Sequence, residues 1–156
     1  MVLGTPLKVD EELESVMFCS KNEENSSYSI ERISYNDYIC STIIAGLENE
    51  IHGIGISNDK RYIILGDYEG FIKVLDLTTL KIVNKINSPN NVWGLTVSDI
   101  DYTAVNWDFQ GNINVFNLYT GDIIKNISLN NINNIRVTFQ NSIRINDIFI
   151  SHNSNY

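Results

Sequence analysis

The sequence predicts an all-β protein built as an array of small, four-stranded antiparallel sheets. Two observations support this fold class. Short stretches rich in β-branched and aromatic residues alternate with Asn-, Asp- and Gly-rich turns. The pattern also repeats, because a shift of 41 positions places Gly53 on Gly94 and Asp67 on Asp108 without a gap. A period of about forty residues is typical of repeat architectures in which each unit packs on the next.

The clearest unit contains four predicted strands, over 51–56, 61–66, 71–76 and 81–86. The turns between them read "SNDK", "DYEG" and "LTTL", and they offer the Asn, Asp and Gly residues that tight turns use. In the third strand Ile72 and Val74 share one face, while Phe71 and Leu75 share the other. Both faces are therefore apolar, which indicates a sheet packed between two neighbouring sheets rather than one with a wet face.

The repeat divides the whole chain. We expect a partial unit over 1–47, two full units over 48–88 and 89–129, a second partial unit over 130–150 and a tail over 151–156. The stretch "MFCSKNEENSSYSIERISYNDYICSTI" can be laid on the last three strands of a unit with one gap, and "VLGTPLKV" can supply the missing first strand. Near the end, "NNIRVTFQNSIRINDIFISHNSNY" resembles the first two strands of another unit.

The stretch "ISNDKRYIILGDYEGFIKVLDLTTLKIV" resembles a repeat of the WD-repeat β-propeller family, and "VSDIDYTAVNWDFQGNINVFNLYTGDII" resembles a second. Three family positions differ. Leu75 and Phe116 stand where the family usually has Trp, Asp76 becomes Asn117 in the second copy, and the acidic residue before the turn glycine is Glu69 and then Gln110. The resemblance implies β-propeller-like blades, three and about half of another, and therefore an incomplete ring. It also implies that a protein partner or a second copy completes the ring.

The amino-acid composition limits the classes of partner that we expect for this chain. The formal net charge is −8 and the isoelectric point is about 4.6, so the surface repels phosphate. We therefore expect no nucleic acid and no membrane as partners. No secretory signal and no long apolar stretch is visible, which favours a cytoplasmic location. The two cysteines, Cys19 and Cys40, are predicted on a second and a fourth strand, as buried thiols held apart by the strand between them.

No set of residues predicts chemistry. The sequence has no zinc-type spacing, no Gly-rich phosphate loop and no nucleophile elbow, so we expect no catalytic residues, no cofactor and no metal. The only histidines are His52 and His152. By the family resemblance, the loops that enter the first strand and join the second to the third lie on one partner-binding face. The residues expected there are His52, Asp67, Tyr68, Trp93, Asp108 and Phe109.

Aromatic side chains at loop tips are common anchors of protein interfaces. The alternative for Trp93, and for Trp107, is packing between units. The function that the sequence favours is a non-enzymatic protein–protein interaction or scaffold module. Two alternatives stay open: a quinoprotein-like enzymatic or cofactor-binding propeller, to which "LYTGDII" is faintly similar, and a degenerate fragment of a larger propeller.

Overall fold

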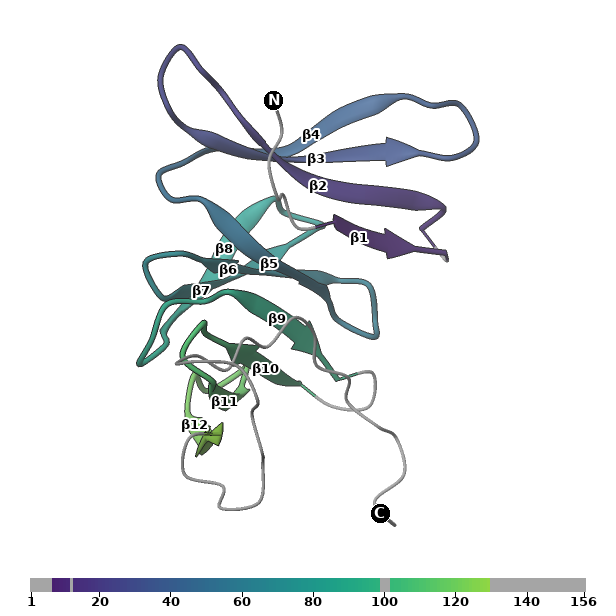
Figure 1. Cartoon of the computed structure of the whole chain (residues 1–156). Coiled ribbons are helices and arrows are strands. Elements are labelled where there is room, and N and C mark those ends of the chain that lie inside the picture. The colour runs from purple at the N-terminus through teal and green to yellow at the C-terminus, as the bar shows by residue number, and fades with distance from the viewer. Residues whose placement is uncertain (1–6, 12, 99–101, 130–156) are drawn as a thin grey trace, which may run out of the picture.

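A computed structural model describes residues 7–11, 13–98 and 102–129. The described chain forms twelve strands arranged as three separate antiparallel sheets of four strands each. The sheets follow one another along the chain and through space, from purple-blue to green (Figure 1). This arrangement confirms the predicted all-β, propeller-like fold, and the three described sheets do not close into a ring. The unit predicted over 130–150, the tail and His152 lie outside the described residues.

Each sheet is a meander of four consecutive strands. The first sheet contains β1 (Leu7–Asp10), β2 (Ser15–Lys21), β3 (Tyr28–Ser34) and β4 (Cys40–Leu47). The second contains β5 (Ile51–Ile56), β6 (Tyr62–Asp67), β7 (Phe71–Asp76) and β8 (Lys81–Asn87). The third contains β9 (Gly94–Val97), β10 (Thr103–Trp107), β11 (Asn112–Asn117) and β12 (Ile123–Ser128).

The strand boundaries agree with the sequence pattern to within one residue in the second sheet. The first sheet contains all four strands, because residues 7–10 supply the strand that pairs with β2. The 41-residue offset is kept in three dimensions, since Val74 pairs with Ile64 and Val115 pairs with Val105.

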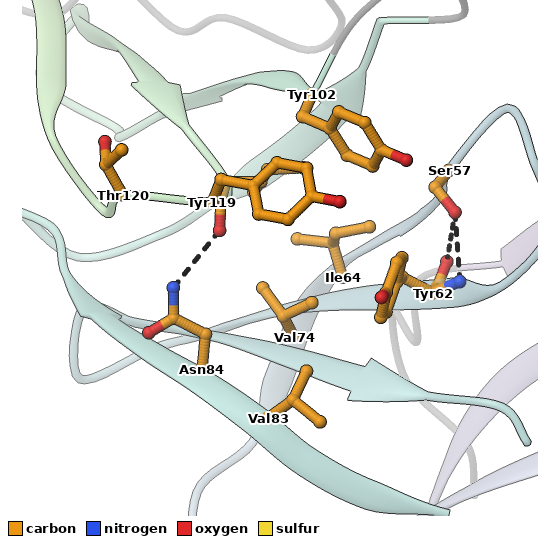
Figure 2. A pocket seen from close by; sticks show the side chains of 10 residues that line it. Ser57, Tyr62, Ile64, Val74, Val83, Asn84, Tyr102, Tyr119 and Thr120 are labelled. Atoms are coloured by element: carbon orange, nitrogen blue, oxygen red, sulfur yellow. Dashed lines mark hydrogen bonds between the residues drawn. The ribbon is translucent and has the colours of Figure 1, made fainter. Parts of the chain in front are cut away.

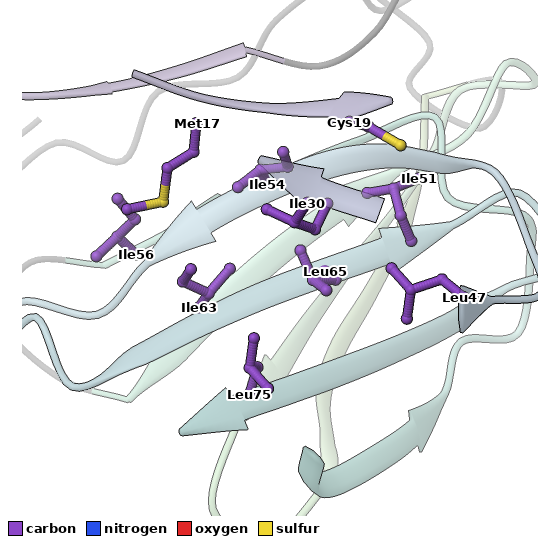
Figure 3. Close-up of a cluster of buried hydrophobic side chains, with 10 residues drawn as sticks. All are labelled: Met17, Cys19, Ile30, Leu47, Ile51, Ile54, Ile56, Ile63, Leu65 and Leu75. Carbon is purple, nitrogen blue, oxygen red and sulfur yellow. The ribbon is translucent and has the colours of Figure 1, made fainter. Parts of the chain in front are cut away.

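Strands β5, β6 and β7 of the second sheet are buried on both faces, as the sequence predicted, while β8 is largely exposed. Ile63, Leu65 and Leu75 belong to a cluster that also contains Met17 and Ile30 of the first sheet (Figure 3). On the other face, Ile64, Ile72 and Val74 pack with Leu95, Ala104 and Phe116 of the third sheet. Two dry interfaces therefore hold the three sheets together.

Glycine determines how closely the second and third sheets approach. Along β5, Ile54 and Ile56 face the first sheet, while Gly53 and Gly55 face β9. A Cβ atom added at Gly53 would lie 2.6 Å from the Cβ of Leu95, well inside van der Waals contact. The "IHGIGI" stretch thus combines large side chains on one face with bare backbone on the other. The innermost strands β5 and β9 can pack almost backbone to backbone.

Candidate partner-binding surface

In the second and third sheets, the turn between the second and third strands is built by a buried aspartate. The Asp67 carboxylate accepts a hydrogen bond from the backbone N–H of Phe71 at 2.8 Å, and Asp108 accepts the equivalent bond from Asn112 at 2.8 Å. Gly70 closes the first turn with a φ of +94°, a backbone conformation that residues with a side chain rarely adopt. The same architecture therefore occurs in both turns.

Asp67 and Asp108 do not lie where the sequence analysis placed them. We expected them on the partner-binding face, but their exposed fractions are 0% and 5%. Each carboxylate folds back into its own turn, because the backbone N–H groups there need an acceptor. The interior also supplies side-chain partners: Lys73 Nζ lies 2.6 Å from Asp67 Oδ2, and Asn112 Nδ2 lies 2.7 Å from Asp108 Oδ2. Both aspartates support the turns and are not available for contact.

The two turns present aromatic side chains at their tips. Tyr68 and Phe109 directly follow the buried aspartates, and they are 44% and 38% exposed. His52 from β5 and Trp93, just before β9, are half-buried between them. The ring centroids are 5.4 Å apart for Tyr68 and His52, 4.9 Å for His52 and Trp93, and 3.6 Å for Trp93 and Phe109. These four side chains form one continuous aromatic row along a rim of the molecule.

The aromatic row joins two sheets. Tyr68 and His52 come from the second sheet, while Trp93 and Phe109 belong to the third and its entry segment. Glu50 adds a carboxylate 3.6 Å from His52 Nε2. A row of planar rings with an acidic edge can bury the apolar side chains of another protein and hydrogen-bond at its border. The structure thus brings together all four aromatic residues that the sequence pointed to.

The predictions for Trp107 and for the two cysteines can be compared with their positions in the structure. Trp107 is buried, and its indole covers Gly94 of β9, the paired strand of its own sheet, where a Cβ would collide with the ring. Cys19 lies on β2 and is buried, and Cys40 begins β4, so the strand placement was right and both thiols are free. The prediction that Cys40 is buried was wrong, because it follows the exposed segment 35–39 at the edge of the sheet.

A pocket that the sequence analysis missed opens at the opposite rim, between the second and third sheets (Figure 2). Its cavity volume is about 380 Å³, and it is lined by residues from five separate stretches of the chain between Ser57 and Thr120. Tyr62 is the first residue of β6, Tyr102 directly precedes β10, and Tyr119 lies in the turn between β11 and β12. No sequence motif joins these tyrosines, since only the packing of two sheets brings them together.

Among residues 7–11, 13–98 and 102–129, no three His, Cys, Asp or Glu side chains are grouped as a metal site would require. Within the same ranges there is no helix long and apolar enough to cross a membrane.

Comparison with known proteins supports the fold and leaves the family undetermined. No protein-family model and no curated protein sequence matches this chain. Solved structures do match. The crystal structure of RRP9 WD40 repeats has a TM-score of 0.63 and 15% identity, over 78% of this chain and 37% of that one. The crystal structure of a nidogen/laminin complex has a TM-score of 0.66 and 8% identity, over 77% of this chain and 45% of that one.

A third similar structure is hydrazine synthase from Kuenenia stuttgartiensis, with a TM-score of 0.63 and 11% identity over 78% of this chain and 34% of that one. This chain spans less than half the length of each of these three structures. The shared feature is the propeller-like arrangement of four-stranded antiparallel sheets. It occurs in a WD40 protein, in a protein complex and in an enzyme, so the likeness describes architecture and not activity.

Proposed function

We propose that this chain is a non-enzymatic protein-interaction module and that its aromatic row contacts a protein partner. The observation that carries the proposal is the row itself: four rings from two sheets in sequence, with Tyr68 and Phe109 exposed at its ends. Rigid aromatic side chains provide large contact areas at low cost in conformational entropy, and interface cores are enriched in them. The buried aspartates hold the turns that carry these tips.

The fold alone does not decide between a binding module and an enzyme. The similar solved structures include WD40 repeats and a nidogen/laminin complex, but also hydrazine synthase. The proposal of a module therefore rests on the aromatic row and on its place at a rim. The acidic net charge of −8 favours a partner surface that is basic around an apolar centre.

The double variant Tyr68→Ala/Phe109→Ala tests the aromatic row. Binding partners are captured with the wild-type chain from an extract of its source cells and quantified by mass spectrometry. We expect the captured partner to be lost with the double variant and retained with Tyr38→Ala, which removes an exposed tyrosine far from the row. Equal melting temperatures would show that all three proteins are folded. Unchanged capture by the double variant would exclude the aromatic row as the contact surface.

We also propose that another chain, or a second copy, extends the array of sheets. The face of the first sheet that points away from the second carries Val9 and Val16, which pair directly across β1 and β2. Val9 is half exposed, and no described sheet covers this face. Light scattering after size exclusion tests self-association: we expect a mass of about twice 17.8 kDa, reduced to a single chain by Val9→Asp. A single-chain mass for the wild type would leave a different protein as the partner.

A further inference from the structure

The pocket at the rim opposite the aromatic row has walls of tyrosine and a floor of aliphatic side chains. We call it the tyrosine pocket and define it by Tyr62, Tyr102 and Tyr119. Figure 2 shows Tyr102 and Tyr119 on one side and Tyr62 on another, with Ile64, Val74 and Val83 between them. Its cavity volume of about 380 Å³ lies within the range of sites that hold small molecules or single side chains.

The tyrosines are held in place by contacts with their neighbours. The rings of Tyr102 and Tyr119 meet edge to face, with centroids 4.3 Å apart and an angle of 66° between their planes. The hydroxyl of Tyr102 donates a hydrogen bond to Asp59 Oδ2 at 3.2 Å. Tyr119 is 65% exposed although its ring lines a cavity, an unusual position for a large side chain that serves only the core. These rings form a prearranged, solvent-accessible wall.

The electrostatics of the mouth favour a positive charge. A hydrogen bond from the Ser57 hydroxyl, followed by one from the backbone of Arg61, lowers the pKa of Asp59, so this carboxylate is ionised at neutral pH. Asp59 forms no ion pair with lysine or arginine within the described ranges. Of the two basic residues that follow it, Lys60 pairs with Asp10 at 2.8 Å and Arg61 with Asp76 at 3.2 Å.

One cation already uses a ring of this pocket. The guanidinium carbon of Arg61 lies 5.1 Å from the centroid of the Tyr62 ring, within the usual range of cation–π contacts. The electron-rich rings of Tyr102 and Tyr119 beside the carboxylate of Asp59 are the combination that attracts organic cations. The floor adds a second preference. Ile64, Val74 and Leu118 are buried and aliphatic. An unalkylated ammonium group would lose its hydrating water beside them, and these side chains have no polar atom to replace it.

We propose that the tyrosine pocket binds an alkylated ammonium group, with its methyl groups against the tyrosine rings and its charge near Asp59. Alkylation spreads the charge and exchanges N–H donors for apolar surface, which suits an aliphatic floor. The group can belong to a small molecule or to a modified lysine of another protein. The site is separate from the aromatic row, so this inference does not depend on the proposed partner contact.

The experiment compares three probes that share a two-carbon alcohol. Choline is titrated into the full chain by calorimetry and by chemical-shift changes, alongside its neutral isostere 3,3-dimethylbutan-1-ol and its unmethylated analogue ethanolamine. We expect choline to bind at least about fivefold more tightly than either, the ratio that a cation–π contact provides. Equal binding of choline and the neutral isostere would reduce the site to an apolar pocket and overturn the proposal. Absence of choline binding at tens of millimolar would overturn it too.

Two variants place the binding at these residues. Tyr119→Leu retains apolar bulk but removes the ring, and Asp59→Asn removes the charge while its single amide oxygen keeps an acceptor for Ser57. Each should weaken choline several-fold and leave the neutral isostere unchanged. Tyr38→Leu, an exposed tyrosine on the first sheet, is the matched control and should bind choline like the wild type. If Tyr119→Leu and Asp59→Asn both bound choline with unchanged affinity, the tyrosine pocket would not be the site.

Discussion

Asp76 and Asn117, which stand 41 positions apart, accept the same two backbone hydrogen bonds. Asp76 Oδ1 receives the N–H groups of Thr78 and Thr79 at 2.8 and 3.0 Å. Asn117 Oδ1 receives those of the two residues at the equivalent positions at 2.9 and 3.1 Å. The repeat is thus conserved within the chain at the level of single hydrogen bonds. The change from carboxylate to amide leaves the turn intact, because one side-chain oxygen is all that it requires.

The first prediction follows from this equivalence. Asp76→Asn should lower the melting temperature at neutral pH only slightly, because it keeps both turn hydrogen bonds and loses the ion pair with the exposed Arg61, whereas Asp76→Ala should lower it by several degrees, since two N–H groups lose their acceptor. Thermal unfolding followed by circular dichroism measures both, and Asn117→Ala should resemble Asp76→Ala. Equal stabilities of the alanine and asparagine variants would show that the turn does not depend on this acceptor.

The same aspartate should contribute to acid sensitivity. Hydrogen bonds from the backbone of Thr79 and then Thr78, together with Arg61, lower the pKa of Asp76. A carboxyl with a lowered pKa in the folded state stabilises the protein above its ordinary pKa of 3.8, and this contribution is lost as the pH falls through the folded value. The stability of Asp76→Asn should therefore decline less between neutral pH and pH 3 or so than that of the wild type. Urea titrations across this range provide the measurement.

The second prediction concerns the close approach of β5 and β9. A methyl group at Gly55 would collide with Val97 and come within 2.9 Å of Leu95 Cδ2, so Gly55→Ala should destabilise the protein by about 1–3 kcal/mol. Val97→Ala removes the nearest obstructing atom. The double variant should therefore lose less than the sum of the single variants, by at least about 0.5 kcal/mol in a double-mutant cycle.

A residue outside this contact is the control for the cycle. Gly55→Ala combined with Tyr38→Ala, an exposed residue of the first sheet, should give additive effects because Tyr38 is not among the atoms that a Cβ at Gly55 would meet. Additive losses for Gly55 and Val97 as well would show that the two residues are not in contact.

The third prediction separates the two thiols. Cys40 is exposed, whereas Cys19 is buried and its burial raises the pKa of its thiol, which leaves less of the reactive thiolate. Brief treatment of the native protein with iodoacetamide should add one label, located at Cys40 by peptide mass. Treatment in denaturant should add two. Labelling of Cys19 at the rate of Cys40 in the native protein would contradict the packing between the first and second sheets.

The fourth prediction concerns alkaline pH. A hydrogen bond with Tyr119, and then the negative charge of Asp59, raises the pKa of Tyr102 from 10.0 to about 12. A tyrosine whose folded pKa is raised contributes stability that is complete below its ordinary pKa and is lost as the pH rises through the folded value. Urea midpoints should therefore fall between pH 10 and about 12, and less steeply in Tyr102→Phe. Tyr38→Phe controls for the loss of one hydroxyl. Identical slopes in all three proteins would contradict the raised pKa of Tyr102.

Local periodicity was sufficient to predict the strands. The alternation in 71–76 places Ile72 and Val74 against one neighbour and Leu75 against another, and both contacts exist. The gapless repeat likewise placed Tyr68 and Phe109 at equivalent turn tips, because equal spacing within a repeat means equal position in each sheet. These successes share one cause, which is that each depends only on residues near one another in sequence.

The predictions of exposure were wrong at the ends of strands, where side chains turn back into the interior. Asp67 and Asp108 have the composition of exposed turn residues, yet the unpaired N–H groups of a tight turn draw their carboxylates inward. In one sheet a lysine forms an ion pair with the buried carboxylate, and in the other an asparagine donates a hydrogen bond to it. The tyrosine pocket was missed for a different reason, because Tyr62 and Tyr119 are brought together only by the packing of separate sheets.

The bare backbone of β5 has a geometric consequence for the whole assembly. The glycines let the second and third sheets approach closely at β5 and β9, and the space between the two sheets widens away from these strands. The outer end of that gap is where the tyrosine pocket opens. The close contact between β5 and β9 also determines the direction in which a further sheet would be placed. A larger residue at Gly53 or Gly55 would widen the angle between the second and third sheets. This would change the curvature that any added copy or partner must match.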